Sequence, residues 1–215
     1  MATLLSRRLA KASSAVALLL GLAAFGTGCA YTTDKIELAY PAAEAGPRIP
    51  GAEAVKLDVT VTDARPQKDK VGAKKNGWGM EAASIVASND VAKVLQDGLH
   101  AELAARGFQP GAGTAHVGVE LVKLMNVFEM GFTSVDANAE IIMNVSVRGG
   151  DGVPLWGKQV VAMGANPGGL LAGGTLAKVA LDRALKAGVM SLMSDGAFID
   201  ALLKAGGATG RTASR

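Results

Sequence analysis

The most reactive side chain in this sequence belongs to Cys29, the only cysteine. A basic segment within 7–11 and an apolar run over 12–25 precede it, followed by small residues up to the cysteine. This order is typical of a secretory signal, in which small residues mark the cleavage site. The apolar run is shorter than the ~20 residues that a membrane-spanning helix needs. The sequence therefore predicts that residues 1–28 are removed after export and that Cys29 begins the mature chain.

Thr27, Gly28 and Cys29 resemble the lipobox of bacterial lipoproteins, in which a diacylglycerol is attached to the cysteine thiol before cleavage. Gly26 departs from that pattern, which usually has Leu three places before the cysteine, and Phe25 supplies an apolar side chain one place earlier. The alternative is an ordinary cleaved signal that leaves a free thiol.

The lipobox resemblance implies a partner and an address. Two or three acyl chains on Cys29 anchor a protein stably to a membrane, whereas one chain binds only marginally. In Gram-negative lipoproteins an Asp after the cysteine tends to retain the protein in the inner membrane, and here that position is Ala30. The expected location is the periplasmic face of the outer membrane.

Charge argues against nucleic acid as a partner. Removing residues 1–28 lowers the number of basic residues from 22 to 19, which equals the 19 acidic residues. The mature chain therefore has no overall positive field to attract a polyanion. Because the lone cysteine is used for acylation, neither a disulfide nor a thiol nucleophile is expected.

The other candidates for chemistry do not form a catalytic set. The glycine-rich segment 168–175 approaches the phosphate-loop pattern, but Gly174 stands where the phosphate-binding Lys belongs. His100 and His116 lack the spacing of metal ligands, and no serine lies in a G-x-S-x-G motif. We therefore predict no catalytic residue, no metal and no cofactor, and a protein that is not an enzyme.

Two segments carry candidate contacts for a partner. Trp78 lies between two glycines, and it either packs over a sheet edge or acts as an exposed anchor for a partner. Phe128, Met130 and Phe132 lie in a segment between two predicted strands, where they either close one end of the core or form an adaptable apolar surface. The nearby basic run from Arg65 to Lys75 is either a solvated loop or a contact for anionic headgroups.

Hydrophobic periodicity places the elements that carry these residues. Alternating patterns predict strands at 55–62, 116–124, 135–148 and 154–165, with a short candidate at 35–40. Helical patterns predict three helices. The first covers 89–106, the second begins after a cap at Thr175, and a short third begins at Asp195. The strand at 135–148 exceeds the usual length, so a bulge or bend is expected. Two registers are open for 154–165, with Trp156, Val160 and Ala162 or with Leu155, Val161 and Met163 facing the core.

The order β-α-β-β-β-α predicts an α+β fold: an antiparallel sheet of about four or five strands with two main helices on one face. The predicted organisation is a signal peptide at 1–28, a lipidated tether at 29–54, a single domain at 55–205 and a disordered tail at 206–215.

Five short motifs distributed over 55–205 resemble the YajG family of Gram-negative lipoproteins. They are Asp63-Ala64-Arg65, Lys75-Asn76-Gly77-Trp78-Gly79-Met80-Glu81, Leu103-Ala104-Ala105-Arg106-Gly107-Phe108, Trp156-Gly157-Lys158 and Phe198-Ile199-Asp200-Ala201-Leu202-Leu203-Lys204. The resemblance implies an envelope lipoprotein and supplies no catalytic motif.

Three functions are compatible with these observations. The favoured one is a non-catalytic accessory protein that binds an envelope partner through the polar sheet face, the Trp78 loop or the Met/Phe segment. The second is a lipid or glycolipid transport auxiliary, which needs a cavity between sheet and helices. The third is an envelope hydrolase, which needs a cleft with converging polar residues.

Overall fold

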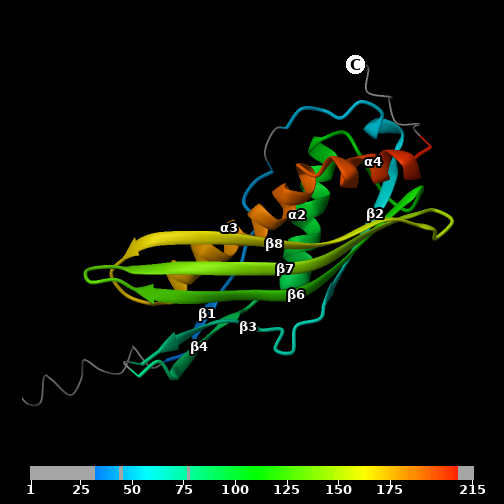
Figure 1. Cartoon of the computed structure of the whole chain (residues 1–215). Coiled ribbons are helices and arrows are strands. Elements are labelled where there is room, and N and C mark those ends of the chain that lie inside the picture. The colour runs from blue at the N-terminus through cyan, green and yellow to red at the C-terminus, as the bar shows by residue number, and fades with distance from the viewer. Residues whose placement is uncertain (1–31, 44–45, 77, 208–215) are drawn as a thin grey trace, which may run out of the picture.

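A computed structural model of the chain describes residues 32–43, 46–76 and 78–207. The signal segment, Cys29 and residues 208–215 of the predicted tail lie outside this part. The described residues form a mixed α+β fold with three α-helices and an eight-stranded sheet (Figure 1). The strands are β1 (Asp34–Ile36), β2 (Lys56–Asp63), β3 (Lys70–Lys75), β4 (Glu81–Ala87), β5 (Gln109–Pro110), β6 (Ala115–Met130), β7 (Val135–Gly149) and β8 (Pro154–Gly169). The helices are α2 (Val91–Ala105), α3 (Gly174–Met193) and α4 (Gly196–Ala205), with a short 3₁₀ turn η2 (Ala52–Ala54).

Strand β6 organises the sheet. On one side it pairs antiparallel with β7, which pairs antiparallel with β8. On its other side β2 runs parallel to the first half of β6, and β3 joins further along, with Gly72 opposite Asn126. Strands β4 and β1 extend the sheet beyond β3. The prediction of four or five antiparallel strands in the order β-α-β-β-β-α is therefore wrong, because a connection containing α2 makes β2 parallel to β6.

The β3–β4 hairpin was missed because its sequence hides its burial. Gly, Ala and Lys are poor strand formers, and a lysine is expected on the solvent side. In the structure Lys74 is buried in β3, because its ammonium group is 3.0 Å from a carboxylate oxygen of Asp34. An ion pair with a distant residue thus replaces the apolar contact that the pattern lacks.

The three long strands agree better with the prediction. Strand β7 keeps its predicted start, and β6 continues to Met130, so Phe128 and Met130 belong to a strand rather than a loop. The bulge or bend was expected within 135–148, whereas the extra residues lie on the partner strands: on β6 between Leu121 and Lys123, and on β8 opposite the two ends of β7. The first register predicted for 154–165 is the observed one: Val160 is buried, and Trp156 and Ala162 are half-buried against the core.

All three helices pack on one face of the sheet. The core between the layers is formed by apolar side chains of α2, α3 and β7, including Leu95, Leu99, Leu103, Leu181, Leu185, Ile141 and Met143. Asp90 caps α2, whose predicted range began at 89, and α3 begins at Gly174 without the cap predicted at Thr175. The third helix starts where predicted, with Asp195 as the residue that caps α4. None of the helices described here is long and apolar enough to cross a bilayer.

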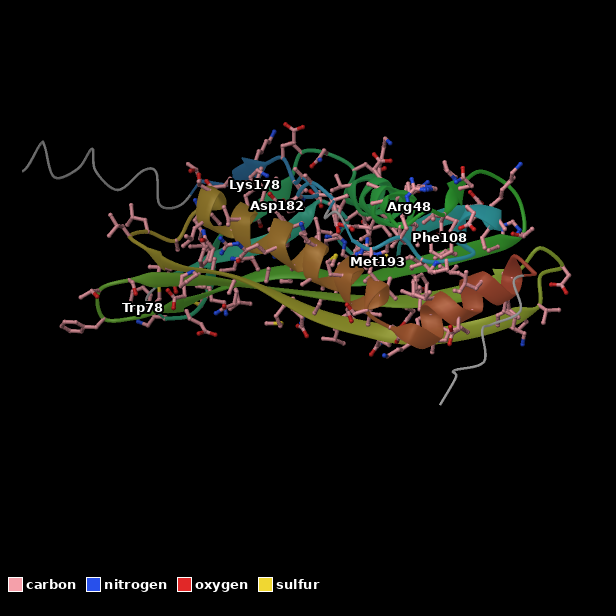
Figure 2. The ribbon with its side chains drawn as sticks, turned by 90° about the horizontal axis from the view of Figure 1, so that it is seen from above. Arg48, Trp78, Phe108, Lys178, Asp182 and Met193 are labelled. Carbon is pink, nitrogen blue, oxygen red and sulfur yellow. The ribbon has the colours of Figure 1, made fainter. Side chains whose placement is uncertain are left out.

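The segment after β1 packs over the helices and corrects the predicted tether at 29–54. Leu38 is buried, and its N–H and C=O both bond the side chain of Asn89. The Tyr40 hydroxyl donates to Glu102 over 3.0 Å, and Asp182 of α3, labelled in Figure 2, accepts from the N–H of Ala39. These contacts make the segment part of the folded domain, which therefore begins at β1 rather than at Val55.

Helix α3 lies so close to β8 that the strand needs a glycine at the crossing. A Cβ atom on Gly164 would lie 2.2 Å from the carbonyl oxygen of Ala180 and 2.3 Å from the amide nitrogen of Ala184. Since both atoms belong to the helix backbone, a side chain would force the whole helix away from the sheet.

We predict that Gly164→Ala lowers the free energy of unfolding by about 1–3 kcal/mol or more, the usual cost of overpacking a core. Gly157→Ala in the same strand is the matched control, because its Cβ would be 3.6 Å from its nearest neighbour, the carbonyl oxygen of Val145. Urea denaturation monitored by circular dichroism measures both variants. Equal stability of the two would contradict the close contact.

Candidate functional site

The turn between β3 and β4 holds Trp78 out in solvent. The side-chain oxygen of Asn76 accepts hydrogen bonds from the N–H groups of Trp78 and Met80, both over 3.0 Å. Gly79 follows with φ of +79°, a conformation that favours glycine. The result is a Trp side chain that is 85% exposed (Figure 2), so it does not pack over the sheet edge. The alternative reading, an exposed contact residue, remains a prediction.

The end of β6 and the turn that follows it present two further apolar side chains, those of Met130 and Phe132. The N–H of Gly131 donates to the carbonyl of Ser134 over 2.8 Å and closes the turn. Met130 is 74% exposed and Phe132 is fully exposed, whereas Phe128 packs partly against the core. Each of the two interpretations of this segment therefore holds for part of it. Phe128 helps to close the core, and Met130 and Phe132 form an exposed surface.

A third turn, between β8 and α3, was not recognised as a site. Leu170 and Leu171 are both more than 80% exposed. The signal in the sequence is a pair of leucines within a run of glycines, which is compatible with either a flexible linker or a small apolar contact loop. Met80 was likewise missed as an exposed apolar residue.

These three turns meet at one end of the molecule. A hollow of about 360 Å³ is lined by Gly79 from the first turn, Phe128 and Met130 from the end of β6 before the second, and Ala172 from the third, together with Lys75 and Asn76. Each exposed apolar residue lies on or close to a segment that lines it. We call this set the apolar tip: Trp78, Met80, Met130, Phe132, Leu170 and Leu171.

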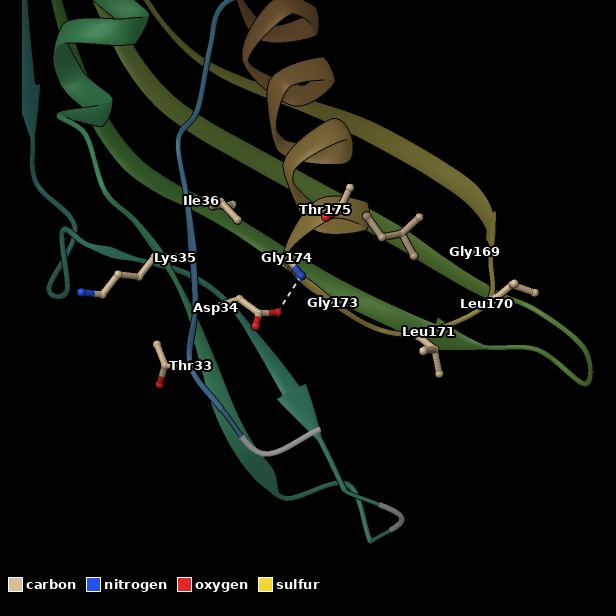
Figure 3. Close-up of a pocket in the computed structure, with 11 residues that line it drawn as sticks. Thr33, Asp34, Lys35, Ile36, Gly169, Leu170, Leu171, Gly173, Gly174 and Thr175 are labelled. Atoms are coloured by element: carbon tan, nitrogen blue, oxygen red, sulfur yellow. Dashed lines mark hydrogen bonds between the residues drawn. The ribbon is translucent and has the colours of Figure 1, made fainter. Parts of the chain in front are cut away.

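Asp34 ties the start of the described chain to the same end. One of its carboxylate oxygens accepts from the N–H of Gly174 over 2.7 Å, at the first residue of α3 (Figure 3). The other pairs with the buried ammonium group of Lys74. A carboxylate of the chain itself therefore occupies the helix N-terminus where a phosphate loop would bind its ligand.

Only part of the basic run from Arg65 to Lys75 is the solvated loop that its composition suggests: residues 66–69 are exposed, and Lys70–Lys75 forms β3. Arg65 is buried and forms a bidentate ion pair with Asp63, over 2.9 and 2.7 Å, while it also donates to the carbonyls of Lys68 and Lys70. Burial raises the pKa of Asp63, but the hydrogen bonds and charge of Arg65 outweigh it and lower the pKa below its usual value. Lys70 pairs with Glu81, so much of this charge is used inside the fold.

Metal-binding geometry is absent from the residues that the structure describes, since no group of three or more His, Cys, Asp or Glu side chains comes together there. His116 lies 3.9 Å from Asp58 on an exposed part of the sheet, and His100 lies on α2. Cys29, the predicted lipidation site, lies outside the described part.

Comparison with known families identifies the chain. The model of the Lipoprotein_16 family, described as uncharacterized lipoproteins, matches residues 46–202. The protein belongs to this family, which is the YajG family indicated by its sequence motifs. No curated protein sequence matches the chain.

Solved structures resemble the fold at low sequence identity. A protein from Xanthomonas campestris, of family DUF330, superposes with a TM-score of 0.52 and 11% identity, over 80% of this chain and 95% of that one. A minor lipoprotein from Acinetobacter baumannii superposes with a TM-score of 0.37 and 10% identity, over 67% of this chain and 92% of that one. A putative lipoprotein from Caulobacter crescentus superposes with a TM-score of 0.34 and 13% identity, over 75% of this chain and 96% of that one. At such identities the Xanthomonas structure supports the fold alone.

Most of the motifs that identify the family stabilise the fold. Asp63 and Arg65 fix the loop after β2, and Gly107, with φ of +105°, ends α2 before the buried Phe108. Trp156 of β8 meets Phe198 of α4 edge to face, with ring centroids 5.2 Å apart. The motif around Trp78 differs from these, because it exposes a large apolar side chain.

We predict that Asp34→Asn lowers the free energy of unfolding by about 1.5–3 kcal/mol, the value of a hydrogen bond to a charged group, because Lys74 is left buried without its counter-ion. Adding Lys74→Met should recover much of the loss, since both charges are then absent. Chemical denaturation of the single and double variants checks this. A single variant as stable as the wild type would show that the pair contributes nothing.

Proposed function

We propose that this protein is an accessory lipoprotein, held on the periplasmic face of the outer membrane by acyl chains on Cys29, that binds another envelope component without catalysing a reaction. Membership of a lipoprotein family and the Thr27-Gly28-Cys29 motif support the anchor. Ala30 after the cysteine supports the outer membrane as its address.

The open face of strands β6, β7 and β8 is the observation that carries the binding role. The helices cover the other face, and on the open face Val161 and Met163 of β8 are more than half exposed. Ile142 of β7 lies directly opposite Val161 in the sheet, so these side chains adjoin one another. An apolar group of this kind in the middle of a sheet face indicates a contact surface.

Polar side chains surround this apolar group and are already ordered. Lys123 pairs with Glu140, and Asn144 bonds both Glu120 and Gln159 across the three strands. An apolar centre within a polar rim is the usual anatomy of a protein interface. Because these side chains hold one another in place, less conformational entropy is lost when a partner covers them. The favoured partner is therefore a protein of the envelope.

The transport-auxiliary alternative is disfavoured by the packing between the layers. A lipid carrier of this design needs a cavity there, and the space is filled by fully buried side chains of both helices and the sheet, such as Leu99, Leu181 and Ile141. The hollow at the apolar tip gives the hydrolase alternative no support, because its lining includes Lys75 and Asn76 beside apolar residues but neither a histidine nor a carboxylate.

Native mass spectrometry of the lipidated protein, extracted gently from outer membranes, tests the proposal. We expect the mass of an acylated chain that begins at Cys29, together with a bound protein. The variant Val161→Ser/Met163→Ser should lose the bound protein, because the apolar centre of the face is removed.

Val153→Ser is the matched control, since Val153 is similarly exposed but lies in the turn before β8. A mature chain without acyl mass would contradict the anchor. A partner retained by the Val161/Met163 variant would contradict the face, and added lipid in place of protein would favour the transport auxiliary.

A further inference from the structure

The apolar tip is an exposed surface formed at three neighbouring turns. Its six large side chains lie in or directly beside three separate turns, and two of those turns are closed by the hydrogen bonds of Asn76 and Gly131. Single exposed apolar residues are common on soluble domains, but several gathered on adjoining turns mark a contact site. The question is what covers them.

The position of the anchor answers it. Thr33 and Asp34 line a pocket together with Leu170 and Leu171, so the described chain starts beside the tip (Figure 3). Only Ala30 and Tyr31 separate Thr32 from Cys29. Three residue steps span at most about 11 Å, so acyl chains on Cys29 hold this end of the domain at the bilayer.

We propose that the apolar tip inserts into the surface of the same bilayer that holds the acyl chains of Cys29. This inference rests on the proposed lipid anchor and names a lipid surface as the occupant of the tip. Trp78 suits the boundary between headgroups and acyl chains, where Trp is enriched, and Phe132 and the two leucines suit its apolar side.

Apolar burial rather than charge drives this contact. The exposed charged residues near the tip have both signs, with Lys35 and Lys75 on one hand and Glu129 on the other. The insertion should therefore occur on neutral phosphatidylcholine as well as on anionic lipid, and it should change little with salt.

The insertion fixes the orientation of the domain. The turns join β3 to β4, β6 to β7 and β8 to α3, so they give the tip three separate points of contact (Figure 1). A strand of 15 residues such as β7 is roughly 50 Å long. The turn at 150–153 therefore projects away from the membrane, and the open face of β6–β8 is presented to the periplasm along its length.

Fluorescence of Trp78 tests the proposal on the lipidated protein. The variant Trp156→Phe leaves Trp78 as the only tryptophan. The protein is added to phosphatidylcholine vesicles with or without bromine on the acyl chains, and flotation reports its attachment. We expect the emission of Trp78 to shift to the blue and to be quenched by the brominated chains.

The outcomes separate the two proposals. A protein that does not float contradicts the lipid anchor. A protein that floats with unquenched, water-like Trp78 emission overturns the insertion alone. A blue shift without quenching also overturns it, because a second copy or another protein surface then covers the tip.

A second measurement uses the rate at which the lipidated protein leaves the vesicles. Phe132→Ser should raise this rate about tenfold, the factor expected when one large apolar side chain is no longer buried. Val153→Ser, at the opposite end of the long strands, should leave it unchanged. Equal rates for the two variants would contradict the insertion of the tip.

Discussion

The carboxylate of Asp34 holds together the end of the molecule on which this account depends. It caps the N-terminus of α3, neutralises the buried ammonium group of Lys74 in β3, and lies in the first strand after the predicted anchor. Gly174 has no side chain for a reason: a Cβ atom there would lie 2.8 Å from Ile36 and 2.9 Å from Asp34. Asp34 thus links the start of α3, the β3–β4 hairpin and the entering chain, which carry or adjoin two of the three turns of the apolar tip.

This arrangement gives the domain two separate candidate contact surfaces. The tip and the proposed acyl chains share one end of the domain, while the open face of the three long strands carries an apolar centre within a polar rim. The first surface suits lipid and the second suits protein. The segment from β1 to η2 packs over the helices, and its contacts with Asn89, Glu102 and Asp182 keep it in the domain. The proposed anchor is therefore joined to the domain by a few residues rather than by a long flexible tether.

Local patterning was sufficient for the elements with a regular period. The alternation in β2 and β7 and the apolar stripe of α2 predict those elements well, because each buries one face against a single core. Strands β3 and β4 were missed, because Lys74 is buried through an ion pair with a residue 40 positions away. The cap of α3 was missed for the same reason: its partner is Asp34, so no local capping residue is present.

The candidate site was predicted in part. Trp78, Met130 and Phe132 were singled out as apolar residues in connecting segments, and the structure brings them to one end. Phe128 is partly buried and lines the hollow, because β6 extends to Met130, beyond the strand that its alternating pattern predicts. The exposure of Leu170 and Leu171, and of Val161 and Met163 on β8, depends on how the strands pair and how the helices cover the sheet. A single sequence does not determine either.

Spin labels on introduced cysteines test the orientation of the domain most directly. With Cys29 acylated, Phe132→Cys and Met163→Cys each provide a single free thiol. On lipidated protein in vesicles, we predict that the label at 132 collides mainly with oxygen, which concentrates in the bilayer. The label at 163 should collide mainly with a water-soluble nickel complex. Equal exposure of both labels to the nickel complex would contradict the account.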